Sequence, residues 1–374
     1  MRNTILVLHR WLGLSAGIVF AIASLTGGVL VFETELDAWL NRGRYPTTPG
    51  LIAPAVLDAA LRDAAGGDEV LRVRWPTPRD PVFAAEIRTG GATRVLWLDP
   101  GTGTQIRPLH GGSRLVPAIR RVHTTLFAGF IGHWVVTISC MIALLGLITG
   151  AILWWPGLAR FASGFAIRAR RGAHILTYDL HQTLGILAFP LLIVLTATGV
   201  LIPFPDAAES IARSIVRSAA APSAWESVPS DRGSGGARMQ IDDLLEAAQR
   251  LTGNERSVPE AILFPADGDS AIDVRLRIRP PGQAGGVVRV LIDRNTGDVL
   301  QVRDPRALDP AARLGTIDVF NLHIGGVGGP FIRWLWFLAC LIGALSLPTG
   351  AVVWWHKRTR KLEASTQRAA RLGM

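Results

Sequence analysis

The chain has 374 residues, of which 49% are hydrophobic and only 18% are charged, a balance typical of membrane proteins rather than of soluble domains. A formal net charge of +10 would suggest nucleic-acid binding in a soluble protein. Here the basic residues flank apolar segments, where anionic lipid headgroups attract them. We therefore expect membrane lipid, and no nucleic acid, as a partner.

Four apolar segments are long enough to cross a membrane, which requires about 20 helical residues. They lie near residues 11–32, 131–155, 183–204 and 332–355. The first has no A-x-A-like cleavage site and is matched by an internal segment. It is therefore expected to be a retained anchor and not a signal peptide.

Basic residues in the short connections predict which side of the membrane each segment faces. They are concentrated after the second span, in the C-terminal tail and at the N-terminus: Arg160, Arg168, Arg170, Arg171, Lys357, Arg358, Arg360, Lys361, Arg2 and Arg10. We therefore expect a multi-pass membrane protein with both termini in the cytoplasm.

Two long polar segments separate spans one and two, and spans three and four. Each carries a helical pattern, at 56–61 and 244–248, followed by alternating strands and a closing hairpin. The hairpin turns run from Asp99 to Gly103 and from Asp293 to Gly297, where glycine takes a positive φ and aspartate bonds the local backbone. The pattern predicts a helix-plus-sheet module that occurs twice. Residues 218–238 are rich in Ser, Ala, Gly and Pro and are predicted to be a flexible linker.

The sequence repeats itself in two registers, and each repeat contains a histidine. Residues 123–155 and 323–355 carry the same residue at 12 positions without a gap, beginning at His123 and His323, and a second register pairs His9 with His181. The matched residues are mostly small or aromatic: Gly129/Gly329, Trp134/Trp334, Cys140/Cys340, Thr149-Gly150/Thr349-Gly350 and Thr26-Gly27/Thr198-Gly199. The mid-span cysteines are expected to be packing residues. We interpret the chain as a duplicated unit with two histidines per copy.

The predicted fold is a membrane α-helical plus α+β protein, in which a four-transmembrane-helix bundle from a duplicated unit carries two periplasmic helix/sheet modules. The expected boundaries are transmembrane helices at 1–35, 119–157, 179–205 and 316–358, periplasmic modules at 36–118 and 206–315, a cytoplasmic loop at 158–178 and a cytoplasmic tail at 359–374. Parallel repeats are related by an axis along the membrane normal, so spans one and three should face each other, as should spans two and four.

The two histidine pairs, His9 with His181 and His123 with His323, are interpreted as metal ligands. A single such histidine would more simply be an interfacial residue, but repeated polar rings beside membrane spans indicate a functional partner. Zinc prefers three or four protein ligands, whereas two opposed neutral imidazoles with room for a planar ring favour a b-type haem. The sequence has no C-x-x-C-H motif, so two non-covalent haems b are expected, with the histidines bound to the haem iron.

Helix rise predicts the depth of each histidine. His9 and Thr26 are 17 residues apart, about 25 Å along a helix. The His9 pair is therefore predicted at the inner face, and the His123 pair at the outer face, after a helix break near Gly129 or Gly325-Gly326. The Thr-Gly steps are predicted to open a gap for a flat macrocycle, although such steps also serve close helix packing.

The remaining histidines do not follow the repeat. His133 aligns with Arg333, and we predict that it is a reserve ligand or a partner for haem propionates. His110, His174 and His356 have no counterpart and are expected to be solvated.

Several motifs resemble the PepSY-associated transmembrane family: His9-Arg10-Trp11-Leu12-Gly13-Leu14, Leu180-His181-x-x-Leu184-Gly185, Leu322-His323-x-Gly325, and Thr-Gly-x-x-x-Trp-Trp at 149–155 and 349–355. The turns at 99–103 and 293–297 resemble those of PepSY modules. The family includes iron-regulated inner-membrane proteins and haem-containing ferric-siderophore reductases. The resemblance implies that the four paired histidines are the family's helix-start histidines and that iron is released reductively in the periplasm.

The predicted function is therefore that of a ferric-siderophore reductase-like oxidoreductase, which moves electrons across the membrane to a periplasmic ferric complex for iron uptake. No G-x-G-x-x-G follows a strand, so the electron donor is expected to be a quinol or a cytoplasmic reductase. Two alternatives stay open. One is a non-redox, membrane-anchored PepSY protein that binds or inhibits a partner, and the other is a metal permease, which the lack of deep acidic residues weakens.

Overall fold

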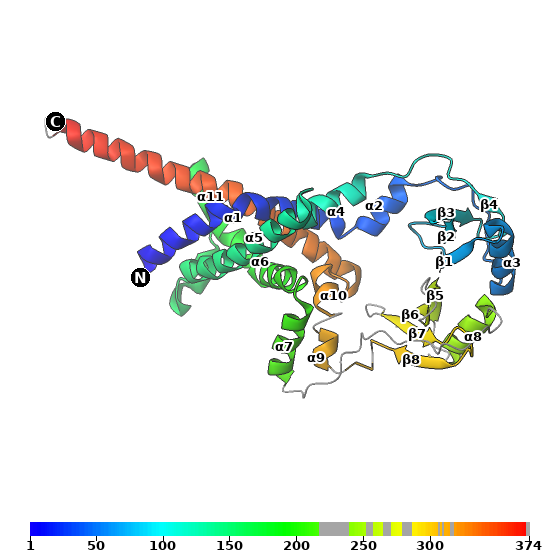
Figure 1. The fold of residues 1–374 in the computed structure, drawn as a ribbon. Coiled ribbons are helices and arrows are strands. Elements are labelled where there is room, and N and C mark those ends of the chain that lie inside the picture. Colours follow the sequence, from blue (N-terminus) through cyan, green and yellow to red (C-terminus); the bar gives the residue numbers. More distant parts are fainter. Residues whose placement is uncertain are drawn as a thin grey trace. The chain divides into compact units, whose positions relative to one another are not determined.

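The structure is a computed structural model that describes residues 1–216, 239–251, 257–264, 271–278, 286–305, 307–308, 310–314 and 318–371. The predicted linker at 218–238 lies outside the described residues. The chain divides into two units, which are described separately (Figure 1). The helical unit comprises residues 1–33, 115–208 and 318–374, and the sheet unit comprises residues 34–114 and 209–317.

Four long apolar helices dominate the helical unit, and each is long and apolar enough to cross a membrane. They are α1 (Arg2–Leu30), α5 (Gly129–Trp154), α6 (Ala173–Leu201) and α11 (Gly329–Arg371). The prediction of four spans is confirmed. All four helices begin before the predicted spans, and α11 also continues past its predicted end, because helical hydrogen bonding continues into sequence outside the apolar pattern.

The four helices pack in a ring, because α1 and α6 each contact both α5 and α11. This places α1 diagonally opposite α6, as expected for spans one and three. Buried apolar side chains form one cluster within the bundle: Val31, Ala188, Leu192, Leu195, Trp336, Ala339 and Cys340. A Cβ added to Gly28 would lie 3.2 Å from the Cβ of Cys340. Both cysteines are free, which agrees with the packing role expected for them.

A short helix precedes each of α5 and α11, and a break separates the two elements. Leu126 and Phe127 adopt φ values of 48° and 60°, which lie in the left-handed region that side chains disfavour. The second break uses glycines instead, with φ values of 69° at Gly325 and 75° at Gly329. The predicted breaks are therefore confirmed at both places. The short helices are α4 (Leu115–Thr125) and α10 (Val319–His323).

The sheet unit contains one eight-stranded antiparallel sheet with the order β4-β3-β2-β1-β5-β6-β7-β8. The strands are β1 (Glu69–Arg74), β2 (Phe83–Thr89), β3 (Ala92–Leu98), β4 (Gln105–Ile106), β5 (Ser257–Leu263), β6 (Ile272–Ile278), β7 (Val287–Ile292) and β8 (Val299–Arg303). The helices α3 (Pro54–Ala65) and α8 (Ile241–Leu251) contribute buried leucines to a core shared with the strands.

The two helix-plus-sheet segments join in a single sheet, because β1 and β5 pair with each other. Val73 lies opposite Ile262 in this pairing. An unpaired strand edge exposes backbone donors and acceptors, and joining the two halves satisfies both edges at once. The remaining elements are α2 (Glu33–Leu40), α7 (Pro205–Val216), α9 (Pro310–Arg313) and the 3₁₀ segments η1 (Leu158–Phe165) and η2 (Ala169–Arg171).

The two closing hairpins have the predicted turns. Asp99 accepts hydrogen bonds from the backbone N–H of Gly101 and of Thr102, at 2.9 and 2.8 Å. Asp293 accepts the equivalent bonds from Asn295 and Thr296, at 2.8 and 2.9 Å. Burial alone would raise the pKa of Asp99, but the hydrogen bonds from Thr48 and Thr102 outweigh it and leave the pKa below its ordinary value.

Candidate functional site: two histidine pairs

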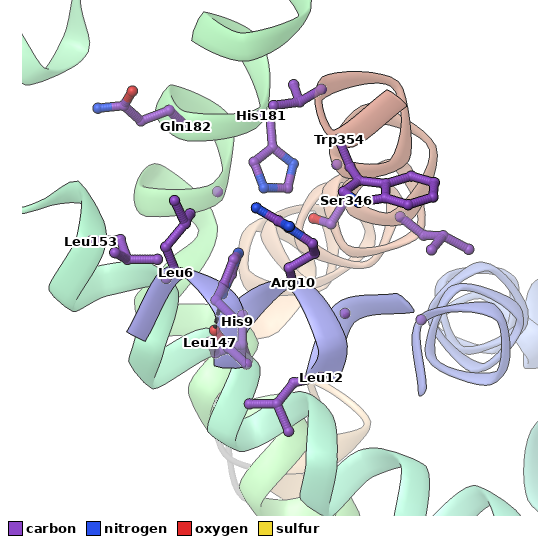
Figure 2. Close-up of a pocket in the computed structure, with 18 of the residues that line it drawn as sticks. Leu6, His9, Arg10, Leu12, Leu147, Leu153, His181, Gln182, Ser346 and Trp354 are labelled. Carbon is purple, nitrogen blue, oxygen red and sulfur yellow. Dashed lines mark hydrogen bonds between the residues drawn. The ribbon is translucent and has the colours of Figure 1, made fainter. Parts of the chain in front are cut away.

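The structure brings His9 and His181 together at the end of the bundle where α1 begins. His9 lies on α1 and His181 on the diagonally opposite α6, and their ring centroids are 6.3 Å apart with an interplanar angle of 67°. Figure 2 shows the two rings directed toward each other across a cavity. We call His9 and His181 the terminal pair.

His123 and His323 form the second pair, which we call the distal pair. These histidines lie on the short helices α4 and α10, and their ring centroids are 6.1 Å apart with an interplanar angle of 44°. His123 contacts the last turns of α1, whereas His9 lies near its start. About 25 Å of helix therefore separates the two sites.

Each histidine is held by a Thr-Gly step on a neighbouring helix, and His9 illustrates the arrangement. Its Nδ1 lies 3.0 Å from the carbonyl oxygen of Gly146 and 3.1 Å from Oγ1 of Thr149. A carbonyl can only accept, so Nδ1 carries the proton and donates it. The Thr149 hydroxyl donates its own proton to the carbonyl of Leu145, at 2.9 Å, and can accept from the imidazole. Nε2 is left with a free lone pair, the form in which imidazole binds a metal.

The other three histidines repeat this arrangement. Each ring contacts the hydroxyl of a threonine and the backbone of the residue three positions before that threonine. Nδ1 of His123 contacts Thr26 at 3.2 Å and Ala23 at 2.9 Å, and Nδ1 of His323 contacts Thr198 at 3.1 Å and Leu195 at 3.0 Å. Nδ1 of His181 contacts Thr349 at 2.9 Å, and the ring also bonds the backbone of Ser346. We call the threonine, the glycine after it and this backbone carbonyl a histidine socket. All four sockets therefore leave Nε2 as the unprotonated nitrogen.

The glycine of each socket makes room for the imidazole itself. An added Cβ would lie 2.9–3.2 Å from Cε1 of the histidine in all four cases: Gly27 against His123, Gly150 against His9, Gly199 against His323 and Gly350 against His181. This corrects the prediction that the Thr-Gly steps clear a gap for a macrocycle. The sequence showed that small residues recur there, but only the packing of two helices shows what fills the space.

Space for a larger group is provided by a different pair of glycines. A cavity of about 390 Å³ adjoins the terminal pair, and ligand pockets typically measure about 300–1,000 Å³. Gly13 and Gly185 line it, and a Cβ added to either would meet nothing within 4 Å. Each lies four residues after a histidine, one turn along the same face of its helix. Apolar side chains such as Leu6, Phe20 and Phe189 complete the lining.

His133 is not brought to the distal pair. Its ring packs against Trp134 at 6.0 Å, and in the described part of the chain no hydrogen bond or ring contact joins it to His123 or His323. The aligned Arg333 donates to the carbonyl oxygen of Val31 at 3.1 Å. The break between α4 and α5 separates His133 from the short helix that carries His123. The two histidines are therefore near each other in the sequence but are not in contact.

One contact was not expected from the sequence. His174 and His356, which have no counterpart in the repeat and were expected to be solvated, have ring centroids 5.9 Å apart. His174 precedes His181 by seven residues and so shares its face of α6, a spacing that could have suggested a position near the terminal pair. No group of three or more metal-binding side chains occurs among the residues that the structure describes.

Four apolar helices with paired imidazoles at both ends of α1 define a multi-pass membrane protein with two candidate metal centres. Residues 6–357, nearly the whole chain, match the family described as PepSY-associated TM region, and the protein belongs to this family. The resemblance drawn from the sequence motifs is thereby confirmed. No curated protein matched the sequence.

Proposed function

We propose that this protein is a di-haem electron carrier of a bacterial inner membrane, with one b-type haem at each histidine pair and both termini in the cytoplasm. In this role it reduces a ferric complex on the periplasmic side, with ferric siderophores as the substrate class. The observation that carries the proposal is the pair of opposed, Nε2-exposing imidazoles at each end of α1.

The spacing of the rings fits a shared metal. An imidazole nitrogen binds a metal at about 2 Å, so two imidazoles on opposite sides of one ion have ring centroids roughly 6 Å apart. The observed separations are 6.3 Å for the terminal pair and 6.1 Å for the distal pair. His9 with His181, and His123 with His323, would each hold the iron of one haem.

The residues around each pair have definable roles. The sockets fix the tautomer and the orientation of each imidazole and increase its basicity toward a metal. The apolar side chains that line the cavity at the terminal pair favour a flat hydrophobic cofactor. When bound, haem would supply reversible one-electron transfer.

The separation of the two sites also supports transfer across a membrane. His9 lies near the beginning of α1 and His123 contacts its last turns, so a membrane-spanning α1 would have one site toward each of its ends. The chain has no dinucleotide-binding motif, so an external quinol or cytoplasmic reductase must supply the electrons. Hard oxygen donors hold ferric iron more tightly than ferrous iron, so reduction releases the metal.

Haem quantitation and absorption spectroscopy test the proposal directly. The protein purified from membranes should contain two haems per chain, with a Soret band and visible bands that sharpen on dithionite reduction. In proteoliposomes, reductant on one side should reduce a ferric chelate on the other. A correctly folded but colourless protein would overturn the proposal and favour the alternative of a non-redox PepSY interaction or inhibitory protein.

A further inference from the structure

The polar groups of the terminal cavity are unusual in their charge. Three cations line it, Arg2 and Arg10 from α1 and Lys357 from α11, and no lining residue in the described part of the chain is acidic. Elsewhere in the helical unit some arginines pair with carboxylates, as Arg168 does with Asp179 at 2.6 Å. The cavity therefore presents a positive mouth beside an apolar interior.

Two of the cations lie on the same side of the histidines. Arg2 precedes His9 by seven residues, and Lys357 follows Gly350, the socket glycine of His181, by seven. Seven residues are two helical turns, so each cation shares the face of its reference residue and lies about 10 Å nearer the end of the bundle. Arg10 is closer to the pair, and Figure 2 shows its side chain extending into the space beside His181.

None of the three cations has a carboxylate partner among the described residues. Arg2 donates to the carbonyl oxygen of Leu153 at 3.0 Å, and Nζ of Lys357 lies 5.1 Å from the centroid of the Tyr178 ring. Arg10 makes no hydrogen bond or ion pair within the part of the chain that the structure describes. Guanidinium groups bind carboxylates through paired, charge-assisted hydrogen bonds, so this mouth is suited to a ligand with more than one negative charge.

The cations also break the symmetry of the repeat. Arg2 and Arg10 align with His174 and Gln182, so the α6 side supplies no positively charged residue at these two positions. Gln182 lines the same cavity as a neutral amide. The positively charged side chains around a planar ligand between the two histidines would therefore come from α1 and α11 and not from α6.

We propose that Arg2, Arg10 and Lys357 bind the two propionate carboxylates of the haem held by His9 and His181. This assignment rests on the proposed function and adds the orientation of the cofactor. The three cations hold its charged edge at the mouth, toward α1 and α11. Leu6, Phe20 and Phe189 receive the apolar remainder.

Binding of haem b and of its dimethyl ester, whose propionates are uncharged, tests the proposal. Haem-stripped full-length protein carrying His123→Ala, which leaves the terminal pair as the binding site, is titrated with each compound. This protein should bind haem b about tenfold or more tightly than the ester. The triple variant Arg2→Gln, Arg10→Gln, Lys357→Gln should lose this preference, and Arg10→Gln alone should lose part of it.

Arg358→Gln is the matched control, because Arg358 adjoins Lys357 but stacks over Trp354 and does not line the cavity. It should keep the full preference. Equal binding of acid and ester by the His123→Ala protein, or an unchanged preference in the triple variant, would overturn the assignment and leave the cations to another anion, such as a phosphate of the electron donor. Binding of neither compound would instead contradict the proposed function. Elution of each variant as a monodisperse species in detergent establishes folding independently of haem.

Discussion

The terminal and distal pairs present the same chemistry on different scaffolds. His9 and His181 lie within the long continuous helices α1 and α6, whereas His123 and His323 lie on the short helices α4 and α10. The distal scaffold depends on backbone breaks, one of which places Leu126 and Phe127 in the left-handed region. The terminal histidines are therefore carried by a more regular backbone than the distal histidines. We expect a substitution in a socket to weaken haem binding less at the terminal pair than at the distal pair.

Removal of a ligand should have the largest effect. His9→Ala or His181→Ala should eliminate the haem of the terminal pair, and His123→Ala or His323→Ala that of the distal pair, because each haem would lose one of its two imidazole ligands. Haem per chain, measured as the pyridine haemochrome, should fall from two to one in each variant. His133→Ala is the control and should retain both haems. A loss with His133→Ala and none with His123→Ala would reassign the distal ligand.

Filling a socket should be the next strongest change. A Cβ at Gly27 would lie 2.9 Å from Cε1 of His123, and one at Gly150 would lie 3.1 Å from Cε1 of His9. Overpacking costs roughly 1–3 kcal/mol, so Gly27→Ala should weaken haem binding at the distal pair by about tenfold or more. Gly150→Ala should weaken the terminal pair less. Titration of stripped protein measures both, with the unaltered site of each variant as internal reference. Equal weakening of both sites by either variant would refute the socket assignment.

Loss of a single socket hydrogen bond should be milder. Thr149→Val keeps the shape of the side chain but leaves the Gly146 carbonyl as the sole partner of Nδ1 in His9. Outer hydrogen-bond partners of metal ligands contribute about 10–100-fold to metal affinity. We expect Thr149→Val to weaken haem binding at the terminal pair by the lower end of this range, because the Gly146 carbonyl remains as a partner of Nδ1. Thr149→Ser should restore binding. Electron paramagnetic resonance of the oxidised protein should show a changed signal for the terminal haem only, whereas no change with Thr149→Val would make the threonine dispensable.

Relief of the left-handed break should stabilise the distal scaffold. A non-glycine residue in this region costs roughly 1–2 kcal/mol, partly offset by the entropy that glycine loses. Leu126→Gly should therefore raise the free energy of unfolding by up to about 1 kcal/mol, and Gly325→Ala should lower it by a similar amount. Unfolding in mixed micelles with increasing dodecyl sulfate measures both. Destabilisation by Leu126→Gly would mean that the leucine side chain contributes more than the strain costs.

The smallest effect should appear in the sheet unit and depend on pH. The folded-state pKa of Asp99 is lowered, so its stabilisation of the turn is fully present above its unfolded pKa of about 4. This contribution is lost as pH falls through the lower folded-state pKa. Hydrogen exchange of residues 92–106 should accelerate across this range, beyond the intrinsic pH effect, in the native chain and not in Asp99→Asn. Parallel pH profiles for the two proteins would exclude Asp99 as the titrating group.

Much of the fold followed from local patterns. The four spans could be found because about 20 apolar residues are required to cross a membrane, whatever their neighbours. The hairpin turns at 99–103 and 293–297 could be found because aspartate and glycine act on their own backbone. The pairing of β1 with β5 could not be found in this way. Alternating buried and exposed side chains are compatible with a strand at the edge of a sheet and equally with one in its middle.

The sequence by itself determined which side chains recur, namely two histidines per repeat and a Thr-Gly step for each. Only the tertiary structure decided what these steps do, because the contact of Thr149-Gly150 with His9 joins two helices that are far apart in the chain. It also decided that Gly13 and Gly185 leave open space and that Arg2 and Lys357 share one mouth. Spans and turns are encoded by neighbouring residues, whereas sockets and cavities exist only once helices have packed side by side.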